Sequence, residues 1–139
     1  MAEHELPNPA PVVTSETRPF WEGTGRGELL LPRCDACHTL FWYPRGFCPA
    51  CGSFSISWQK ASGRGQVYSF TVNRRGVADH PDYREAGVYV LAYVQLEEGP
   101  RIMTNIVECE PDRVAVGQPV QVVFHDTGHG TALPRFRPA

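Results

Sequence analysis

Two Cys-x-x-Cys motifs constrain the fold of this chain more than any other feature of its sequence. Cys34 and Cys37 form the first motif, and Cys48 and Cys51 form the second. A Cys-x-x-Cys turn directs both sulfurs towards one point, so two facing turns supply the four thiolates of a tetrahedral Zn²⁺ site. Four thiolates leave no coordination position open for water. The spacing therefore predicts a structural zinc ribbon, with Zn²⁺ as a structural cofactor and not a catalytic metal.

Two disulfide bonds, or chance, are the alternatives for these four cysteines. Disulfides persist in oxidising compartments, and residues 1–5 lack the basic start and apolar core of a secretory signal peptide. No apolar run in the sequence approaches the roughly 18 residues that suggest a membrane span. We therefore expect a cytoplasmic protein with no membrane partner, whose reduced thiols hold the metal.

The charge balance argues against a nucleic-acid-binding protein. The chain carries 13 basic and 15 acidic residues, a formal net charge of −2, whereas nucleic-acid-binding domains usually present a basic face. We expect no nucleic-acid partner. A nucleic-acid-binding zinc-ribbon module is the alternative of a different functional class.

The chain divides into three segments. Residues 1–27 hold a polar, proline-rich arm and a short helix that starts after Thr17 and is weakened by glycines. Residues 28–60 form the ribbon, for which we expect three strands. The middle strand is placed at 39–44, and the last one contains Phe54, Ile56 and Trp58 in alternation with serines at 53–57, the pattern of a half-buried strand.

Residues 61–139 have an all-β pattern with glycine-rich turns. The expected strands cover residues 66–73, 87–96, 101–107, 118–124 and 133–136. Five short strands with such turns indicate a small Greek-key barrel of the OB type. The predicted fold class is all-β, with a short N-terminal helix and a zinc ribbon followed by a five-stranded OB-fold barrel.

The adjacent aromatic residues Phe20 and Trp21 lie on the weak helix, where they need a surface to pack against. They either pack on the core of this chain or anchor a partner, because interfaces favour Trp and Phe. Both are candidate partner-binding residues.

No catalytic residue is expected in this chain. Cys109 is flanked by two glutamates that raise the pKa of its thiol, which indicates an inert cysteine. His125 and His129 lie on a glycine-rich loop, which is either a solvated loop or a group able to bind metal or move a proton. A small hydrolase built on this loop is a third hypothesis. Against it, the sequence has no nucleophile elbow, phosphate loop or dinucleotide fingerprint.

Motifs along most of the chain match one known family. They are Pro19-Phe20-Trp21-Glu22, the two cysteine motifs, Ser62–Ser69, Gly99-Pro100-Arg101, Gly117–Val120 and Leu133–Phe136. Through these motifs residues 14–138 resemble the domain of unknown function 35 family, whose members join a rubredoxin-like zinc ribbon to an OB-fold and associate with acyl-CoA enzymes.

The resemblance implies a partner for this chain. Family members pair with thiolase-fold enzymes, including acyl-CoA thiolases and retro-aldolases that shorten steroid side chains, and others are fused to or paired with hotdog-fold enoyl-CoA hydratases. We expect a non-catalytic accessory subunit that binds and stabilises a thiolase-fold enzyme in lipid metabolism. The most specific expectation is a retro-aldolase, a lyase, that cleaves a steroid side-chain CoA thioester. A partner acyl-CoA thiolase, acyltransferase or hotdog-fold hydratase is the alternative.

Arg74, Arg75 and Arg84 lie in the long loop between two of the predicted strands. Arginines pair well with phosphate groups, so these three are candidates for binding the phosphates of coenzyme A. The alternative is a solvated loop with no ligand.

Overall fold

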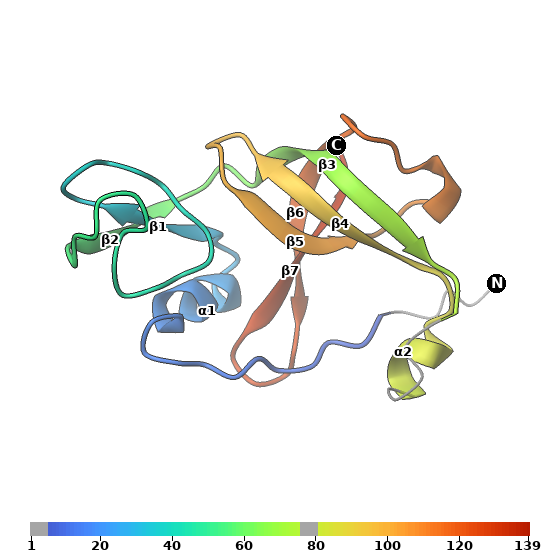
Figure 1. Ribbon diagram of the computed structural model, residues 1–139. Coiled ribbons are helices and arrows are strands. Elements are labelled where there is room, and N and C mark those ends of the chain that lie inside the picture. The colour runs from blue at the N-terminus through green and yellow to red at the C-terminus, as the bar shows by residue number, and fades with distance from the viewer. Residues whose placement is uncertain (1–5, 76–80) are drawn as a thin grey trace.

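A computed structural model of the chain describes residues 6–75 and 81–139. Residues 1–5, for which we predicted no signal peptide, lie outside the described residues. Gly76, which follows the candidate arginines Arg74 and Arg75, also lies outside them. A helix and a small ribbon sheet lie beside a β-barrel (Figure 1). The elements are α1 (Arg18–Gly25), β1 (Leu30–Cys34), β2 (Ile56–Lys60), β3 (Arg64–Asn73), α2 (Pro81–Glu85), β4 (Tyr89–Leu96), β5 (Arg101–Ile106), η1 (Pro111–Arg113), β6 (Pro119–Asp126) and β7 (Ala132–Pro138). Within the described ranges, no helix is long and apolar enough to cross a membrane.

The barrel confirms the predicted fold class. Its five strands close in the order β3-β4-β5-β7-β6. Side chains of β4 and β5 alternate between buried and more exposed positions, as expected where one face of a sheet meets a core. The barrel closes least tightly between β5 and β7. These strands pair in parallel at a single position, Ile106 with Phe136.

The ribbon sheet has two strands, so the prediction of a third strand at 39–44 is wrong. Only Leu40 forms a bridge, to Arg33. Phe41 is buried and its neighbour Trp42 also packs against the core. Consecutive side chains of a strand point to opposite faces, so two successive inward-facing rings are incompatible with a continuing strand.

The prediction for the last ribbon strand is correct only in its second half. β2 begins at Ile56, while Phe54 lies before the strand and is 84% exposed. The serine alternation at 53–57 therefore marks the approach to the strand as well as the strand itself.

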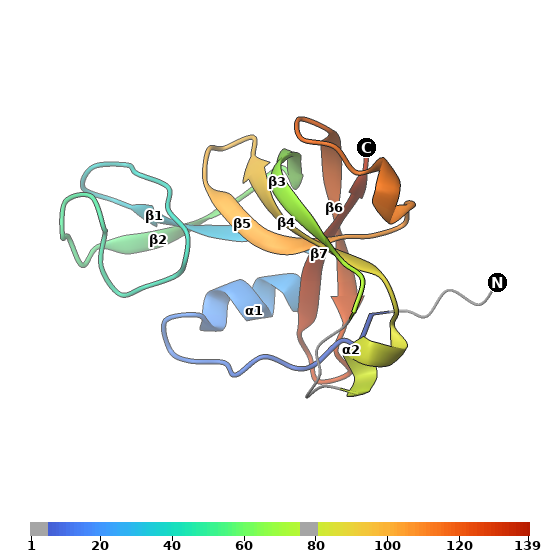
Figure 2. The same ribbon diagram turned by 45° about the vertical axis from the view of Figure 1, so that its right-hand side comes forward.

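One core joins the helix, the ribbon and the barrel. Phe20 from α1 and Leu31 from β1 belong to the same buried cluster as Val94, Ile102 and Phe136 of the barrel. A shared core fixes neighbouring elements to one another. Helix α1 contacts both β1 of the ribbon and β7 of the barrel, and two views show it between them (Figures 1 and 2).

Helix α1 begins after Thr17 as predicted, but the Thr17 side chain makes no capping hydrogen bond to the helix. Its hydroxyl lies instead beside that of Thr14, at 3.1 Å. At the other end, Thr24 is buried, and its hydroxyl accepts a hydrogen bond from the backbone N–H of Ala132 at the start of β7. This contact links the helix to the barrel.

Candidate metal centre and an aromatic groove

The first cysteine motif forms a tight turn at the end of β1. The backbone N–H of Cys34 donates to the carbonyl of Thr39, and the N–H of His38 donates to the carbonyl of Cys34, both at 2.9 Å. His38 has a φ of 64°, in the left-handed region. The N–H of Cys37 points at the Cys34 sulfur from 3.4 Å.

The second motif repeats the same turn fourteen residues later. The N–H of Cys48 donates to the carbonyl of Ser53 at 2.8 Å, and that of Gly52 donates to the carbonyl of Cys48 at 2.9 Å. Gly52 has a φ of 79° and so occupies the conformation of His38 in the first turn. Two equivalent turns thus present their sulfurs to one another.

The four sulfur atoms lie within 4.8 Å of one another. Cys34 Sγ and Cys51 Sγ are 3.5 Å apart, and Cys37 Sγ and Cys48 Sγ are 3.6 Å apart. Four thiolates about 2.3 Å from a tetrahedral metal stand about 3.8 Å from each other, and a disulfide joins sulfurs at about 2.05 Å. The donor set fits a metal, and the disulfide alternative is wrong, because all four cysteines are free.

The surroundings shift the pKa values of these thiols in different directions. A hydrogen bond from the Thr39 side chain is the main cause that lowers the pKa of Cys37 to about 6, and the N–H of Cys37 lowers the pKa of Cys34. A backbone hydrogen bond from Ser53 lowers the pKa of Cys51, but the neighbouring Cys34 and Cys37 outweigh it and raise the value to about 12. A cation at the centre favours all four thiolates, since metal binding displaces such protons.

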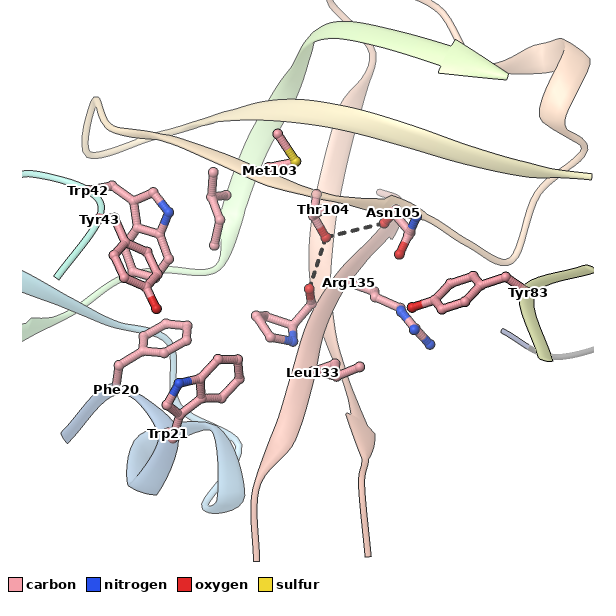
Figure 3. Close-up of a pocket in the computed structure, with 12 residues that line it drawn as sticks. Phe20, Trp21, Trp42, Tyr43, Tyr83, Met103, Thr104, Asn105, Leu133 and Arg135 are labelled. Carbon is pink, nitrogen blue, oxygen red and sulfur yellow. Dashed lines mark hydrogen bonds between the residues drawn. The ribbon is translucent and has the colours of Figure 1, made fainter. Parts of the chain in front are cut away.

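A groove of about 300 Å³ lies between α1, β5 and β7 (Figure 3). One end is built from Phe20, Trp21, Trp42 and Tyr43. The Phe20 ring centroid lies 4.8 Å from that of Trp21 and 4.7 Å from that of Trp42, both edge to face. This end is a rigid apolar surface, because each ring supports its neighbour.

Arg135 lies at the other end of the groove and is only 2% exposed. Its Nη1 donates to Asn8 Oδ1 at 2.6 Å and to His125 Nδ1 at 2.8 Å, and its Nη2 donates to the carbonyl of Pro7 at 2.6 Å. Burial lowers the pKa of Arg135. The guanidinium ties the proline-rich arm to the barrel at Pro7 and Asn8.

The structure separates the two candidate partner-binding residues. Phe20 is 1% exposed and belongs to the core, the environment expected if it packs on the chain's own core. Trp21 is partly buried and lines the groove. Its Nε1 is buried and has no hydrogen-bond partner in the described part of the chain.

The candidate coenzyme A residues do not line this groove, although Tyr83, next to Arg84, does. Arg74 and Arg75 follow the end of β3, and Arg84 lies in α2 at the same end of the barrel (Figure 1). All three are exposed, and Arg74 forms an ion pair with Asp112. They form no part of the metal centre.

The His125–Gly130 loop is tied to its surroundings. His125 contacts Arg135, and the hydroxyls of Thr127 and Thr131 close the loop at 2.8 Å. Over residues 6–75 and 81–139, the four cysteines are the one group of three or more potential metal ligands, so a metal site on this loop has no support there.

Cys109 lies apart from the cysteine cluster and is partly buried. Burial, and to a lesser degree the charge of Glu110, raise the pKa of its thiol. The expectation of an inert cysteine agrees with this environment, since the thiolate is the reactive form.

A four-cysteine ribbon that leads into a closed five-stranded OB barrel defines a zinc-ribbon/OB-fold protein. Residues 21–57 match the family model described as the ChsH2 rubredoxin-like zinc ribbon domain, and residues 58–125 match that of the ChsH2 C-terminal OB-fold domain. A DUF35 domain-containing scaffold protein of Methanocaldococcus jannaschii is 39% identical over 117 residues, which cover 79% of this chain and 81% of that protein. The chain belongs to the DUF35 family, as its sequence motifs predicted.

Two further similarities concern named enzymes. A probable enoyl-CoA hydratase alpha subunit of Thermomonospora curvata is 38% identical over 132 residues. The match covers 94% of this chain but only 40% of that subunit. A solved chain of the Ltp2-ChsH2(DUF35) aldolase is 36% identical, with a TM-score of 0.82 over 93% of this chain and 98% of that chain.

Proposed function

We propose that this chain is a non-catalytic accessory subunit that binds and stabilises a thiolase-fold acyl-CoA enzyme. The near-complete match to a chain of the Ltp2-ChsH2(DUF35) aldolase carries the proposal. That match includes both the ribbon and the barrel, and at 36% identity it concerns sequence as well as fold. The thiolase fold of the partner is what the family resemblance implies.

The environment of the reactive side chains supports a non-catalytic role. The pKa of Cys109 is raised, and His125 is hydrogen-bonded to a buried arginine. Neither provides the nucleophile and base pair that a stand-alone acyl-transfer or hydrolytic enzyme needs. The catalytic residues of the complex then belong to the partner.

We assign Cys34, Cys37, Cys48 and Cys51 to one structural Zn²⁺. Four sulfurs in near-tetrahedral spacing satisfy the preference of zinc for closed thiolate sites. When bound, the metal contributes folding free energy to the ribbon. Free thiols of this kind fit a reducing compartment, in agreement with a cytoplasmic location.

The proposed reaction of the complex is the retro-aldol cleavage of a steroid side-chain CoA thioester. The aldolase match supports the reaction class, and the steroid substrate follows from the family resemblance alone. Arg74, Arg75 and Arg84 are exposed at one end of the barrel. We propose them as contacts to the phosphates of coenzyme A.

A second candidate partner is a hotdog-fold enoyl-CoA hydratase. The similarity to a hydratase alpha subunit favours it. Because the match spans 40% of that subunit, the hydratase activity itself is not transferred to this chain.

Co-expression tests the proposal. The chain is produced with a tag beside thiolase-fold proteins of the same genome, and in parallel beside hotdog-fold hydratases. We expect a stable complex with a thiolase-fold protein that survives size-exclusion chromatography. Formation of a complex with a hydratase alone would support the second candidate, and no complex with either would contradict the accessory role.

A further inference from the structure

Strand β5 has a backbone edge that no strand covers along half of its length. β4 pairs with β5 from Gln95–Arg101 to Val90–Ile106, whereas β7 meets β5 only at Ile106. Towards Arg101 the two strands diverge, and the aromatic groove lies in the gap between them (Figure 3).

The hydrogen-bond register shows which residues face this gap. Leu96 N–H donates to the carbonyl of Pro100, so in an antiparallel ladder the hydrogen-bonded partners on β5 are every second residue from Pro100, including Ile102 and Thr104. The backbone groups of Arg101 and Met103 therefore point away from β4. Val107 obeys the same alternation, because its N–H donates to Phe136 of β7.

The lining of the groove agrees with this assignment. Four consecutive residues of β5, from Ile102 to Asn105, line the groove, and so do three consecutive residues of β7. Side chains of a strand alternate between faces, so a run of successive residues is exposed along an edge and not on one face. In the described part of the chain, no backbone hydrogen bond reaches Arg101 or Met103 from this side.

The surface beside the edge is mainly apolar, and Arg101 is the charged residue on it. Met103 is 54% exposed and lies opposite Tyr93, which is 42% exposed, with Leu91 next to them on β4. The guanidinium of Arg101 stacks on the Tyr68 ring at 3.7 Å. Three exposed apolar side chains along an open edge form the kind of surface that a second protein covers.

The residues that line the groove indicate the chemistry of its occupant. Arg135 is the one charged side chain in its lining, and its guanidinium already donates to three groups of this chain. The lining also contains the uncharged polar side chains of Tyr43, Tyr83, Thr104 and Asn105, and the buried Nε1 of Trp21 has no acceptor in the described part of the chain. An occupant with an uncharged, apolar side chain matches this mainly aromatic lining.

We propose that the edge of β5 at Arg101 and Met103 binds an extended segment of the partner enzyme, which adds as a strand beside β5. The segment's backbone exchanges hydrogen bonds with Met103, and one apolar side chain enters the aromatic end of the groove. Strand addition of this type takes affinity from the backbone and specificity from the side-chain pocket. The proposal rests on the accessory role above, which supplies the partner.

Hydrogen exchange measured by mass spectrometry tests the proposal on the intact complex. We expect the gap-facing amides of Arg101 and Met103 to exchange at least tenfold more slowly in the complex than in the free chain, while those of the β6–β7 hairpin change little. A complex that forms without this protection would overturn the edge contact and leave the accessory role standing. The absence of any complex would instead contradict the accessory role.

Two further outcomes identify a different occupant and would also overturn the proposal. Protection of 101–105 that grows with the concentration of this chain alone would indicate a second copy of the chain. Protection on addition of a long-chain acyl-CoA without the partner would indicate a lipid ligand.

A pair of substitutions separates the backbone from the side chain. Met103→Pro removes the N–H that faces the gap without removing a bond to β4, and Met103→Leu keeps that N–H. We expect the proline variant to bind the partner about tenfold more weakly, the effect of one or two hydrogen bonds, and the leucine variant to bind within about twofold of the wild type. Zinc content and melting temperature of each free variant report on folding. Equal binding by a folded proline variant would contradict the proposal.

Discussion

Gly25 at the end of α1 packs directly against the backbone of Gly130 in the β6–β7 loop. A methyl group at Gly25 would stand closer than 3.0 Å to the carbonyl oxygen of Gly130, a separation that carbon and oxygen do not tolerate without movement. The glycine that weakens the helix thus permits the helix to approach the barrel.

The first prediction concerns the sign of a substitution at this contact. Gly→Ala in a helix ordinarily stabilises by up to about 1 kcal/mol. Gly25→Ala should instead destabilise the chain by roughly 1–3 kcal/mol, the cost of overpacking. Gly46→Ala is the control, because Gly46 has open space around it and no positive φ. Chemical denaturation measures both, and a more stable Gly25→Ala variant would contradict the packing.

The second prediction concerns the metal. The folded chain should contain one Zn²⁺, and Cys48→Ala should lose it together with the ribbon sheet, because metal affinity here is folding free energy. Acid should release the metal, since protons compete for thiolates and the affinity falls as pH falls. Elemental analysis beside circular dichroism checks this. Cys109→Ala is the matched control, and a folded Cys48→Ala chain with full zinc content would refute the site.

The third prediction separates Phe20 from Trp21. Phe20→Ala should lower the free energy of unfolding by about 3–5 kcal/mol, because it empties a core position. Trp21→Ala should weaken partner binding by roughly 2–4 kcal/mol, as expected of an interface hot spot. Melting curves and partner titrations run on both variants test this. If Trp21→Ala lowers only stability, with unchanged affinity per folded chain, Trp21 is a core residue and not an anchor.

The fourth prediction concerns Cys109. Its folded-state pKa is raised by burial and by Glu110, so the folded thiol keeps its proton at pH values where the unfolded thiol, with a pKa of about 8.5, ionises. Stability is therefore unaffected by this group below about pH 8 and falls as pH rises above it. The wild type should lose more stability than Cys109→Ser between about pH 8 and pH 10. Parallel slopes for the two proteins would contradict the buried thiol.

The sequence predicts local features of this fold well. Cysteine spacing identifies the metal centre because both ligand pairs lie in short turns, and the barrel strands are identified because glycine-rich turns separate them. The prediction fails at 39–44, where Phe41 and Trp42 both turn inward. Tertiary packing decides that segment, and no local pattern reports it.

The groove could not be predicted, because it joins elements that are distant in the chain. Trp21, Trp42, Met103 and Arg135 meet only after the barrel closes around its core. The tether from Arg135 to Asn8 spans 127 residues of sequence. Such contacts have no periodicity or spacing that a single sequence displays.

The accessory role is tested most directly by one activity measurement. Retro-aldol cleavage of a steroid side-chain CoA thioester is followed for the thiolase-fold partner alone, for this chain alone, and for the two together. We predict cleavage by the complex, little or none by the partner alone, and none by this chain. Equal turnover by the partner with and without this chain, or cleavage by this chain alone, would contradict the account.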